Sequence, residues 1–246
     1  MSASSAIILA AGHGSRMGAL TMDRPKAMLE VDGRPLIDWQ LDALASYGII
    51  DVTVIAGHQQ QRLREHLGSR VRFIENTRYR DTNSLYSLSL ASARIADGAV
   101  IMNSDVLVSR ELLGTLVSAP VEDAALVDDA TVLADEEMKV RVWQGFIIDF
   151  SKELAPWEAH GENVGILKFG PHGGRRLAAL LDAIAGTHPQ AWAPRAFRAL
   201  AQEWPLRAVM TSGLPWTEID FPDDLERARN VIAPAIGARS SRRHAA

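Results

Sequence analysis

The sequence contains no cysteine. Without thiols the chain can form neither a disulfide framework nor a cysteine-based zinc site. Any metal that it binds must be held by oxygen or imidazole ligands. This composition fits a protein from a reducing compartment.

The chain also lacks a long apolar run and an excess of positive charge. No stretch reaches the roughly 20 apolar residues that a membrane span needs, and the opening residues MSASS lack the basic start and apolar core of a signal peptide. We therefore expect a cytoplasmic protein with no membrane partner. The formal net charge of −4 argues against a general nucleic-acid binder, which needs a basic field to release counterions.

The composition does favour a folded core, because 47% of the 246 residues are hydrophobic. In the first half, short apolar and β-branched runs predict strands, and the stretches between them are long enough for crossover helices. These runs cover residues 6–10, 51–57, 70–75 and 99–105. Between the first two, Pro35 begins a predicted helix that ends at Gly48 and places Ile37, Leu41 and Leu44 on one face.

The pattern changes after residue 125. A hairpin is predicted around Gln144 and Gly145, and further strands and helices follow at 163–170, 173–186, 206–213, 216–221 and from 222 onward. We predict an α/β fold: an open, mostly parallel mixed sheet flanked by helices, with a more antiparallel insertion in its second half. One domain should cover residues 1–236, followed by a flexible tail at 237–246.

A glycine loop follows the first predicted strand, in the segment AIILAAGHGSRMG. In open α/β sheets ligands lie beyond the carboxyl ends of the strands, and the backbone N–H groups of Gly12 and Gly14 can approach a phosphate there. The loop is neither a P-loop nor a G-x-G-x-x-G motif, because it lacks Gly-Lys-Ser/Thr and Gly18 comes one residue too late. With Arg16 and the later Pro25-Lys26 it suits a nucleoside triphosphate. The alternative, a tight turn beside solvated cations, is disfavoured by the combination.

These segments resemble the nucleotidyltransferase family that includes sugar-phosphate nucleotidylyltransferases and the cytidylyltransferases acting on phosphocholine and aminoalkylphosphonates. Further matches lie at 75–91, 102–107, 128–140, 161–170 and 216–228. The block ENTRYRDTNS is most similar to the phosphocholine and phosphonate branch. The resemblance implies a Rossmann-like nucleotidyltransferase fold, with a nucleotide-binding half over about 1–110 and an acceptor-binding half over about 111–236.

The resemblance also implies the residues that bind the nucleotide. Arg16 and Lys26 would be catalytic, and the nucleotide-binding residues would be Leu9, Ala10, Ala11, Gly12, Gly14, Ser15, Arg16, Lys26, Thr82, Asn83, Ser84 and Ser104. Asn83 or Ser84 can equally cap a helix. His13 has no predicted partner and is interpreted as a variable loop residue.

Asp105 and Asp220 each end a predicted strand. Alone, such an aspartate is more often a cap or turn residue. The resemblance implies instead that the two hold Mg²⁺ against the phosphates of the nucleotide, which suits carboxylate oxygens. Asp223 and Asp224 follow Pro222 in a first helical turn and are given a structural role.

The acceptor is less defined by the sequence. Trp143, Trp157 and Trp192 could bind a quaternary ammonium through their ring faces, although ordinary packing is the alternative for each. A primary amine would require a carboxylate instead, and the candidates are Asp128, Asp129, Glu158 and Glu162. Lys139 matches a family position near the active site and is expected to bind the phosphate or phosphonate of the acceptor, unless it is an exposed strand lysine.

We therefore predict a Mg²⁺-dependent cytidylyltransferase that joins CTP to a small acceptor such as phosphocholine, phosphoethanolamine or 2-aminoethylphosphonate. A sugar-1-phosphate nucleotidylyltransferase and a non-catalytic nucleotide-binding module are the alternatives, and the sequence does not exclude UTP. The oligomeric state stays open, and a homodimer is compatible with the sequence.

Overall fold

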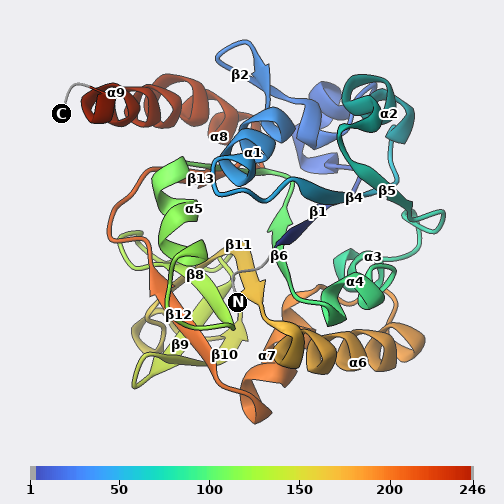
Figure 1. Ribbon diagram of the computed structural model, residues 1–246, viewed down its shortest axis with the longest axis vertical. Coiled ribbons are helices and arrows are strands. Elements are labelled where there is room, and N and C mark those ends of the chain that lie inside the picture. Colours follow the sequence, from blue (N-terminus) through green and yellow to red (C-terminus); the bar gives the residue numbers. More distant parts are fainter. Residues whose placement is uncertain (1–3, 245–246) are drawn as a thin grey trace.

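The apolar run near the start of the chain forms β1, the third strand of the main sheet. In the computed structural model, which describes residues 4–244 and the side chains of residues 4–239, it belongs to a nine-stranded sheet of order β5-β4-β1-β6-β11-β8-β12-β10-β9 (Figure 1). The strands of this sheet are β1 (Ser5–Ala10), β4 (Asp51–Ala56), β5 (Arg72–Glu75), β6 (Ala99–Asn103), β8 (Ala124–Asp128), β9 (Lys139–Trp143), β10 (Phe146–Ser151), β11 (Gly161–Phe169) and β12 (Leu206–Met210).

The sheet changes polarity halfway across. β5, β4, β1 and β6 are parallel, whereas β11 runs antiparallel to both β6 and β8. Beyond them β8 and β12 are parallel, and β10 is antiparallel to β12 and β9. The predicted mixed α/β fold is confirmed, with the expected hairpin at Gln144 and Gly145. The pairing of β9 with β11 at Gly161 and Glu162 closes the strands of the second half into a ring.

Helices cover both faces of the sheet, because successive residues of a buried strand point to opposite sides. Ile8 belongs to the apolar cluster that includes side chains of α1, α2 and α5. Ile7 belongs to the cluster on the other face, with side chains of α3, α4, α6 and α7 (Figure 1). Their bounds are α1 (Leu36–Ala45), α2 (Gln60–Leu67), α3 (Ser84–Ser89), α4 (Ser92–Ala96), α5 (Arg110–Val117), α6 (Pro171–Thr187) and α7 (Pro194–Glu203). On the predicted face of α1, Ile37 and Leu44 are buried and Leu41 packs against the same core.

A third apolar cluster joins the C-terminal helices to two small sheets. It contains Met17, Leu107, Ile219, Leu225 and Ile232. The small sheets pair β7 (Val106–Val108) with β13 (Trp216–Glu218) and β2 (Glu30–Val31) with β3 (Arg34–Pro35). The remaining elements are α8 (Pro222–Arg227), α9 (Ala233–His244), the π-helical turn η5 (Ala228–Ile232) and the 3₁₀ turns η1 (Ser15–Thr21), η2 (Lys26–Met28), η3 (Gly68–Arg70) and η4 (Pro156–Glu158). This cluster places the segment after β13 beside the carboxyl end of β6.

The segment predicted to be a flexible tail, residues 237–246, begins within helix α9. Helix α9 continues to His244 and extends away from the sheet (Figure 1), while residues 245–246 lie outside the described part. Ile236 is buried in the third cluster, and Arg239 Nη1 lies 3.7 Å from Glu111 Oε2. These contacts attach the start of α9 to the body of the molecule.

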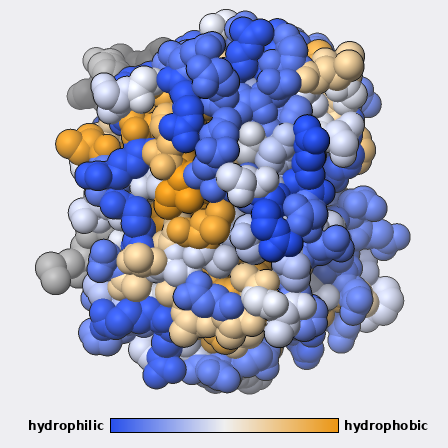
Figure 2. Space-filling view, turned by 90° about the vertical axis from the view of Figure 1, so that its right-hand side faces the viewer, coloured by the Kyte–Doolittle hydropathy of each residue, from blue (hydrophilic) through white to orange (hydrophobic). Residues whose placement is uncertain are grey.

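Among residues 4–244, no helix combines the length and the apolar character needed to cross a membrane. The face of the molecule in Figure 2 is mainly hydrophilic, and one group of hydrophobic side chains lies near its centre.

Candidate functional site

A cavity of about 670 Å³ opens at the carboxyl ends of β1 and β6, and residues from both halves of the chain line it. Every residue predicted to bind the nucleotide lines this cavity: Leu9, Ala10, Ala11, Gly12, Gly14, Ser15, Arg16, Lys26, Thr82, Asn83, Ser84 and Ser104. Asp105 and Asp220 line it as well. The structure therefore brings these residues together, and nucleotide binding by them remains a prediction.

The loop after β1 has a shape that requires glycine at position 14. Gly14 has a φ of 63°, which favours glycine. A Cβ atom at Gly14 would lie 3.3 Å from Thr21 Cγ2 and 3.5 Å from the Lys26 side chain. The Thr21 hydroxyl and the Met17 N–H each donate to the Gly14 carbonyl at 2.9 Å. The loop thus packs closely against Lys26.

Asp105 lies in the turn between β6 and β7, which a buried glutamine holds. Gln40 of α1 is 0% exposed, and its Nε2 donates to the carbonyls of Asn103 and Val106 at 2.8 Å each. These two carbonyls flank Ser104 and Asp105, so the backbone of the turn is fixed from both sides. Gln40 was not predicted to have this role.

Asp220 is held beside Asp105 by its own segment. The Ile219 N–H donates to the Asp105 carbonyl at 3.0 Å. Asp224 Oδ2 accepts hydrogen bonds from the N–H groups of Asp220 at 2.9 Å and Phe221 at 2.7 Å. Asp224 therefore caps the start of α8 and also orients the backbone at Asp220.

Lys26 bridges the two predicted metal ligands. Its Nζ lies 2.9 Å from Asp105 Oδ2 and 2.6 Å from Asp220 Oδ1. Burial disfavours the ammonium, but the two carboxylates outweigh that effect and raise the pKa of Lys26. Arg16 Nη2 lies 2.8 Å from Asp220 Oδ2, and its guanidinium stacks 5.2 Å from the centre of the Phe221 ring. Both predicted catalytic cations thus face the same carboxylate.

A third carboxylate, Glu218, completes this group and was missed in the sequence. Carboxylate oxygens of Asp105, Glu218 and Asp220 lie within 4.8 Å of one another. Burial, followed by the charges of Asp105 and Asp220, raises the pKa of Glu218 well above its usual value. Because side chains two residues apart in a strand share a face, the spacing of Glu218 and Asp220 was the signal that could have identified it.

The three carboxylates fit a hard divalent cation. Asp105 Oδ1 is buried and has no hydrogen-bond partner within the described part of the chain. An orphaned carboxylate oxygen is costly unless a cation or water satisfies it. Oxygen ligands from several carboxylates are the donor set that Mg²⁺ prefers.

One part of the cavity lining is formed by the loop before α3. Asn83 Oδ1 accepts the Ser84 N–H at 2.7 Å, so the predicted cap is confirmed. This bond leaves Asn83 Nδ2 as the donor on a side chain that lines the cavity. Ser84 Oγ accepts the Ala193 N–H at 2.9 Å, which ties this loop to the segment carrying Trp192.

A second part of the cavity lining is rich in carboxylates. Of the predicted acceptor residues, Glu162, Asp128 and Trp192 line the cavity, together with Glu136, Glu137 and Lys152. The Lys152 ammonium lies 4.8 Å from the centre of the Trp192 ring and 3.3 Å from Glu136 Oε2. Burial, followed by the charges of Glu137 and Asp128, raises the pKa of Glu162 to about 7. The cavity therefore already holds one cation, the Lys152 ammonium, against the Trp192 ring.

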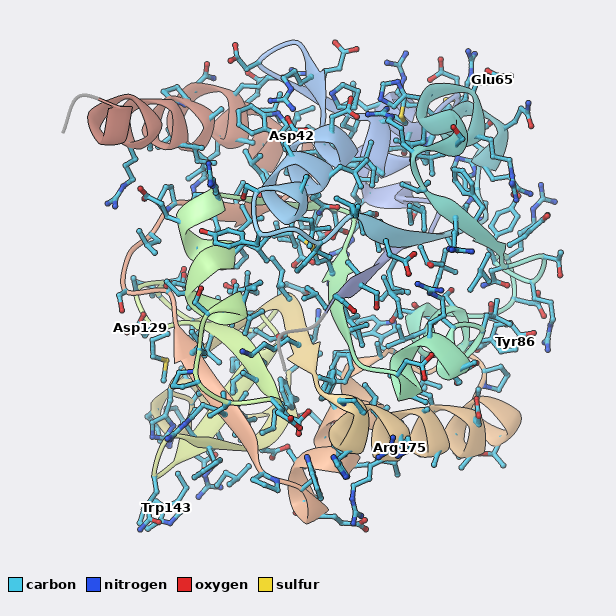
Figure 3. All side chains as sticks on the ribbon, in the orientation of Figure 1. Asp42, Glu65, Tyr86, Asp129, Trp143 and Arg175 are labelled. Atoms are coloured by element: carbon cyan, nitrogen blue, oxygen red, sulfur yellow. The ribbon has the colours of Figure 1, made fainter. Side chains whose placement is uncertain are left out.

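Other predicted acceptor residues do not line the cavity. Trp143 lies at the end of the β9–β10 hairpin and is 66% exposed, pointing away from the body (Figure 3). Trp157 of η4 is 86% exposed, and neither it nor Glu158 reaches the cavity. The hairpin and η4 direct these side chains outward, so the structure does not bring them to the cavity.

Lys139 and Asp129 are also placed differently from the prediction. Lys139 is 1% exposed, and its Nζ donates to the carbonyls of Lys152 at 2.9 Å and Asp135 at 3.4 Å. Asp129 lies at the edge of the molecule (Figure 3) and accepts the Ser212 N–H at 3.0 Å. Within the described residues neither side chain lines the cavity.

His13 was expected to have no partner, and the structure corrects this. Its ring lies 4.7 Å from that of His58 and 4.9 Å from that of Tyr79. Burial, followed by the electrostatic effects of His58 and Arg80, lowers the pKa of His13. His58 Nε2 is 2.9 Å from the carbonyl of Thr21, the last residue of η1. The cluster of His13, His58 and Tyr79 therefore contacts the segment that follows the glycine loop.

Comparison with known proteins gives independent evidence on the family and the fold of the chain. A family model described as MobA-like NTP transferase domain matches residues 6–211. A CTP:phosphoglutamine cytidylyltransferase from Campylobacter jejuni is 27% identical over 90% of this chain and 97% of its own. A choline-phosphate cytidylyltransferase from Streptococcus pneumoniae is 40% identical over 39% of this chain and 42% of its own. The solved structure of a CTP:phosphocholine cytidylyltransferase from Streptococcus pneumoniae superposes with a TM-score of 0.78 at 21% identity, covering 94% of this chain and 99% of that one.

Proposed function

This chain belongs to the MobA-like NTP transferase family, and from that premise we propose that it is a cytidylyltransferase. It joins CTP to a small acceptor that bears a phosphate or phosphonate group, and it releases pyrophosphate. The observation that carries the proposal is the bridge of Lys26 between Asp105 and Asp220, in a cavity whose lining includes both the glycine loop and the carboxylate-rich part.

The reaction needs no general base. The second pKa of a phosphate monoester is roughly 6, so the acceptor is already an oxyanion near neutral pH. One of its oxygens attacks the α-phosphorus of CTP and forms a P–O–P bond, or C–P–O–P for a phosphonate. The bond from the α-phosphorus to the bridging oxygen breaks, and pyrophosphate leaves with that electron pair. The protein must therefore align the two anions and neutralise their charge.

The two cations of the glycine loop supply that neutralisation. Arg16 and Lys26 stand beside the loop whose N–H groups are predicted to receive the phosphates. Both are paired with Asp220 in this structure. A triphosphate offers them additional anionic partners, and the guanidinium of Arg16 suits a bidentate contact.

We propose Mg²⁺ as the cofactor, held by Asp105 and Asp220 with Glu218 as the added carboxylate. When bound, the ion polarises the α-phosphate and stabilises the charge of the departing pyrophosphate. The unsatisfied Asp105 Oδ1 is the feature of this chain that favours such an ion.

Two groups of cavity-lining residues support the choice of substrates. The Asn83 Nδ2 donor suits the O2 and N3 acceptors of cytosine, and uracil offers a donor at N3 instead. Glu162 and the Trp192 ring suit an ammonium head group. The relatives named for phosphocholine and phosphoglutamine support a small phosphorylated acceptor.

The test is a pyrophosphate-release screen of CTP and UTP against phosphocholine, phosphoethanolamine, 2-aminoethylphosphonate and sugar 1-phosphates. We expect turnover with CTP and one of the amino acceptors, dependent on Mg²⁺. Turnover of glucose 1-phosphate with UTP alone would assign a sugar-1-phosphate nucleotidylyltransferase instead. Binding of CTP without any turnover would favour a non-catalytic module.

A further inference from the structure

The phosphate group of the acceptor needs a cation, and the predicted one does not reach the cavity. Lys139 is buried, and its ammonium is bonded to two backbone carbonyls. The cationic side chains that line the cavity among the described residues are Arg16, Lys26, Lys152 and Arg227. The acceptor phosphate must lie next to the α-phosphate, so its partner must be close to the carboxylates proposed to hold Mg²⁺.

Three of these four cations already have carboxylate partners. Arg16 and Lys26 pair with Asp220, and Lys152 pairs with Glu136. Arg227 differs from them: its Nη1 donates to the Thr217 hydroxyl at 3.3 Å, and no ion pair with a carboxylate is present for it within the described residues. A guanidinium has five N–H donors, so most of its donors remain available.

The position of Arg227 also fits the place where the acceptor phosphate must lie. Asp224 and Arg227 of α8 and its N-cap Phe221 follow one another at a spacing of three residues, and all three line the cavity. The partner of Arg227, Thr217, is buried and directly precedes Glu218. Arg227 therefore contacts the strand that carries Glu218, and its charge also acts on Glu162.

We propose that Arg227 binds the phosphate or phosphonate group of the acceptor and holds its attacking oxygen beside the carboxylate group. This inference rests on the proposed function and names a residue that binds the acceptor in that same site. The planar guanidinium can donate two parallel hydrogen bonds to a phosphate, which fixes direction as well as position. Arg227 thus takes the place that the sequence assigned to Lys139.

This role of Arg227 also determines the direction in which the acceptor binds. Its phosphate faces Arg227 near Glu218, and its ammonium faces Glu162 and Trp192. The two ends of a zwitterion then meet opposite charges from this chain. An acceptor bound in the opposite direction would place its phosphate group among four carboxylates, those of Asp128, Glu136, Glu137 and Glu162.

The experiment compares Arg227→Gln and Arg227→Lys with Arg229→Gln as a matched control. Arg229 is in the following turn, where it pairs with Glu226 at 3.0 Å and with the Glu30 carbonyl at 3.0 Å, away from the cavity lining. KM for the acceptor and for CTP, kcat and the melting temperature are measured for each variant. Competitive inhibition by methylphosphonate, which has no ammonium, reports on the phosphate contact alone.

Arg227→Gln is expected to raise the acceptor KM and the methylphosphonate Ki by on the order of 10-fold or more, as for the loss of a charged hydrogen bond. CTP KM and the melting temperature should stay near those of the wild type. Arg227→Lys should recover part of the loss, and Arg229→Gln should change none of these values. An acceptor KM within twofold of wild type in Arg227→Gln, or equal rises in both KM values, overturns the role of Arg227 and leaves the proposed function standing. Absence of wild-type turnover with every acceptor overturns the proposed function itself.

Discussion

Lys26 Nζ lies 2.6 Å from Asp220 Oδ1, although 194 residues of sequence separate the two. The same ammonium contacts Asp105 at 2.9 Å. The fold therefore positions this ammonium between the two carboxylates. Such preorganised charge is the main means by which enzymes stabilise developing anions.

Replacing Lys26 by alanine should lower kcat/KM by on the order of 10²-fold or more, because one preorganised donor is lost at the developing charge. The measurement is steady-state turnover of CTP with the preferred acceptor. Arg24→Ala is the control, since Arg24 is exposed and pairs with Asp23. A loss of only a few-fold in Lys26→Ala would contradict a role in phosphate binding.

Asp105→Asn and Asp220→Asn should each abolish Mg²⁺-dependent turnover while the fold survives, because neutral amides are poor ligands for a hard cation. Binding of Mn²⁺, followed by its electron paramagnetic resonance signal, should weaken in parallel. Asp223→Asn is the control, since Asp223 lies in the exposed first turn of α8. Near wild-type activity in either purified variant would remove the metal assignment.

Gln40→Met should reduce both stability and turnover. Its Nε2 holds two backbone carbonyls at 2.8 Å around the Asp105 turn, and leaving buried acceptors unpaired costs about 1–3 kcal/mol. Urea denaturation measures the stability loss. Gln61→Met serves as the control, because Gln61 is exposed on α2. If unfolding of Gln40→Met matches the wild type, Gln40 does not support the turn.

Trp192→Leu should raise the acceptor KM if the head group is quaternary, since the ring contributes roughly 0.5–2 kcal/mol of cation attraction. CTP KM should hardly change. Trp157→Leu is the matched control, because Trp157 is 86% exposed and outside the cavity. For a primary amine, Glu162→Gln should have the larger effect instead. An unchanged acceptor KM in both cavity variants would place the head group elsewhere.

The raised pKa of Glu162 predicts a dependence of stability on pH. Its pKa of about 7 in the folded chain exceeds the ordinary value of 4.5, so the folded state binds more protons than the unfolded state between these values. The free energy of unfolding attributable to Glu162 should therefore fall as pH rises through this window. Glu162→Gln, which does not titrate, should be more stable than wild type by about 2 kcal/mol at pH 8, with a smaller difference near pH 5.

This comparison is made by urea denaturation in EDTA, with the exposed Glu158→Gln as the control. A difference between Glu162→Gln and wild type that is constant from pH 5 to pH 8 would show that Glu162 titrates normally.

Much of the first half could be predicted from the sequence, because its strands are continuous apolar runs and its loop glycines have local causes. Gly14 has a φ of 63°, which glycine adopts readily. The capping role of Asn83 likewise depends on its immediate neighbours. Local chemistry therefore sufficed for the glycine loop, the start of α3 and the position of Asp105.

The acceptor end could not be predicted in the same way. The direction of Trp143 depends on which strands β9 pairs with, and the burial of Lys139 depends on the carbonyl of Lys152 across the hairpin. Gln40 shows the same limit, because its partners are 63 and 66 residues away. A single sequence does not specify such register-dependent contacts.

Strand β11 has a consequence for how the chain unfolds. Through Leu167 it pairs with Ile101 of β6 on one side and with Ala125 of β8 on the other. Its first residues also complete the ring of strands in the second half. Neither half of the sheet can lose β11 without exposing a hydrogen-bonded edge of the other. We therefore expect the two halves of the sheet to unfold in one cooperative transition, with equal calorimetric and van't Hoff enthalpies.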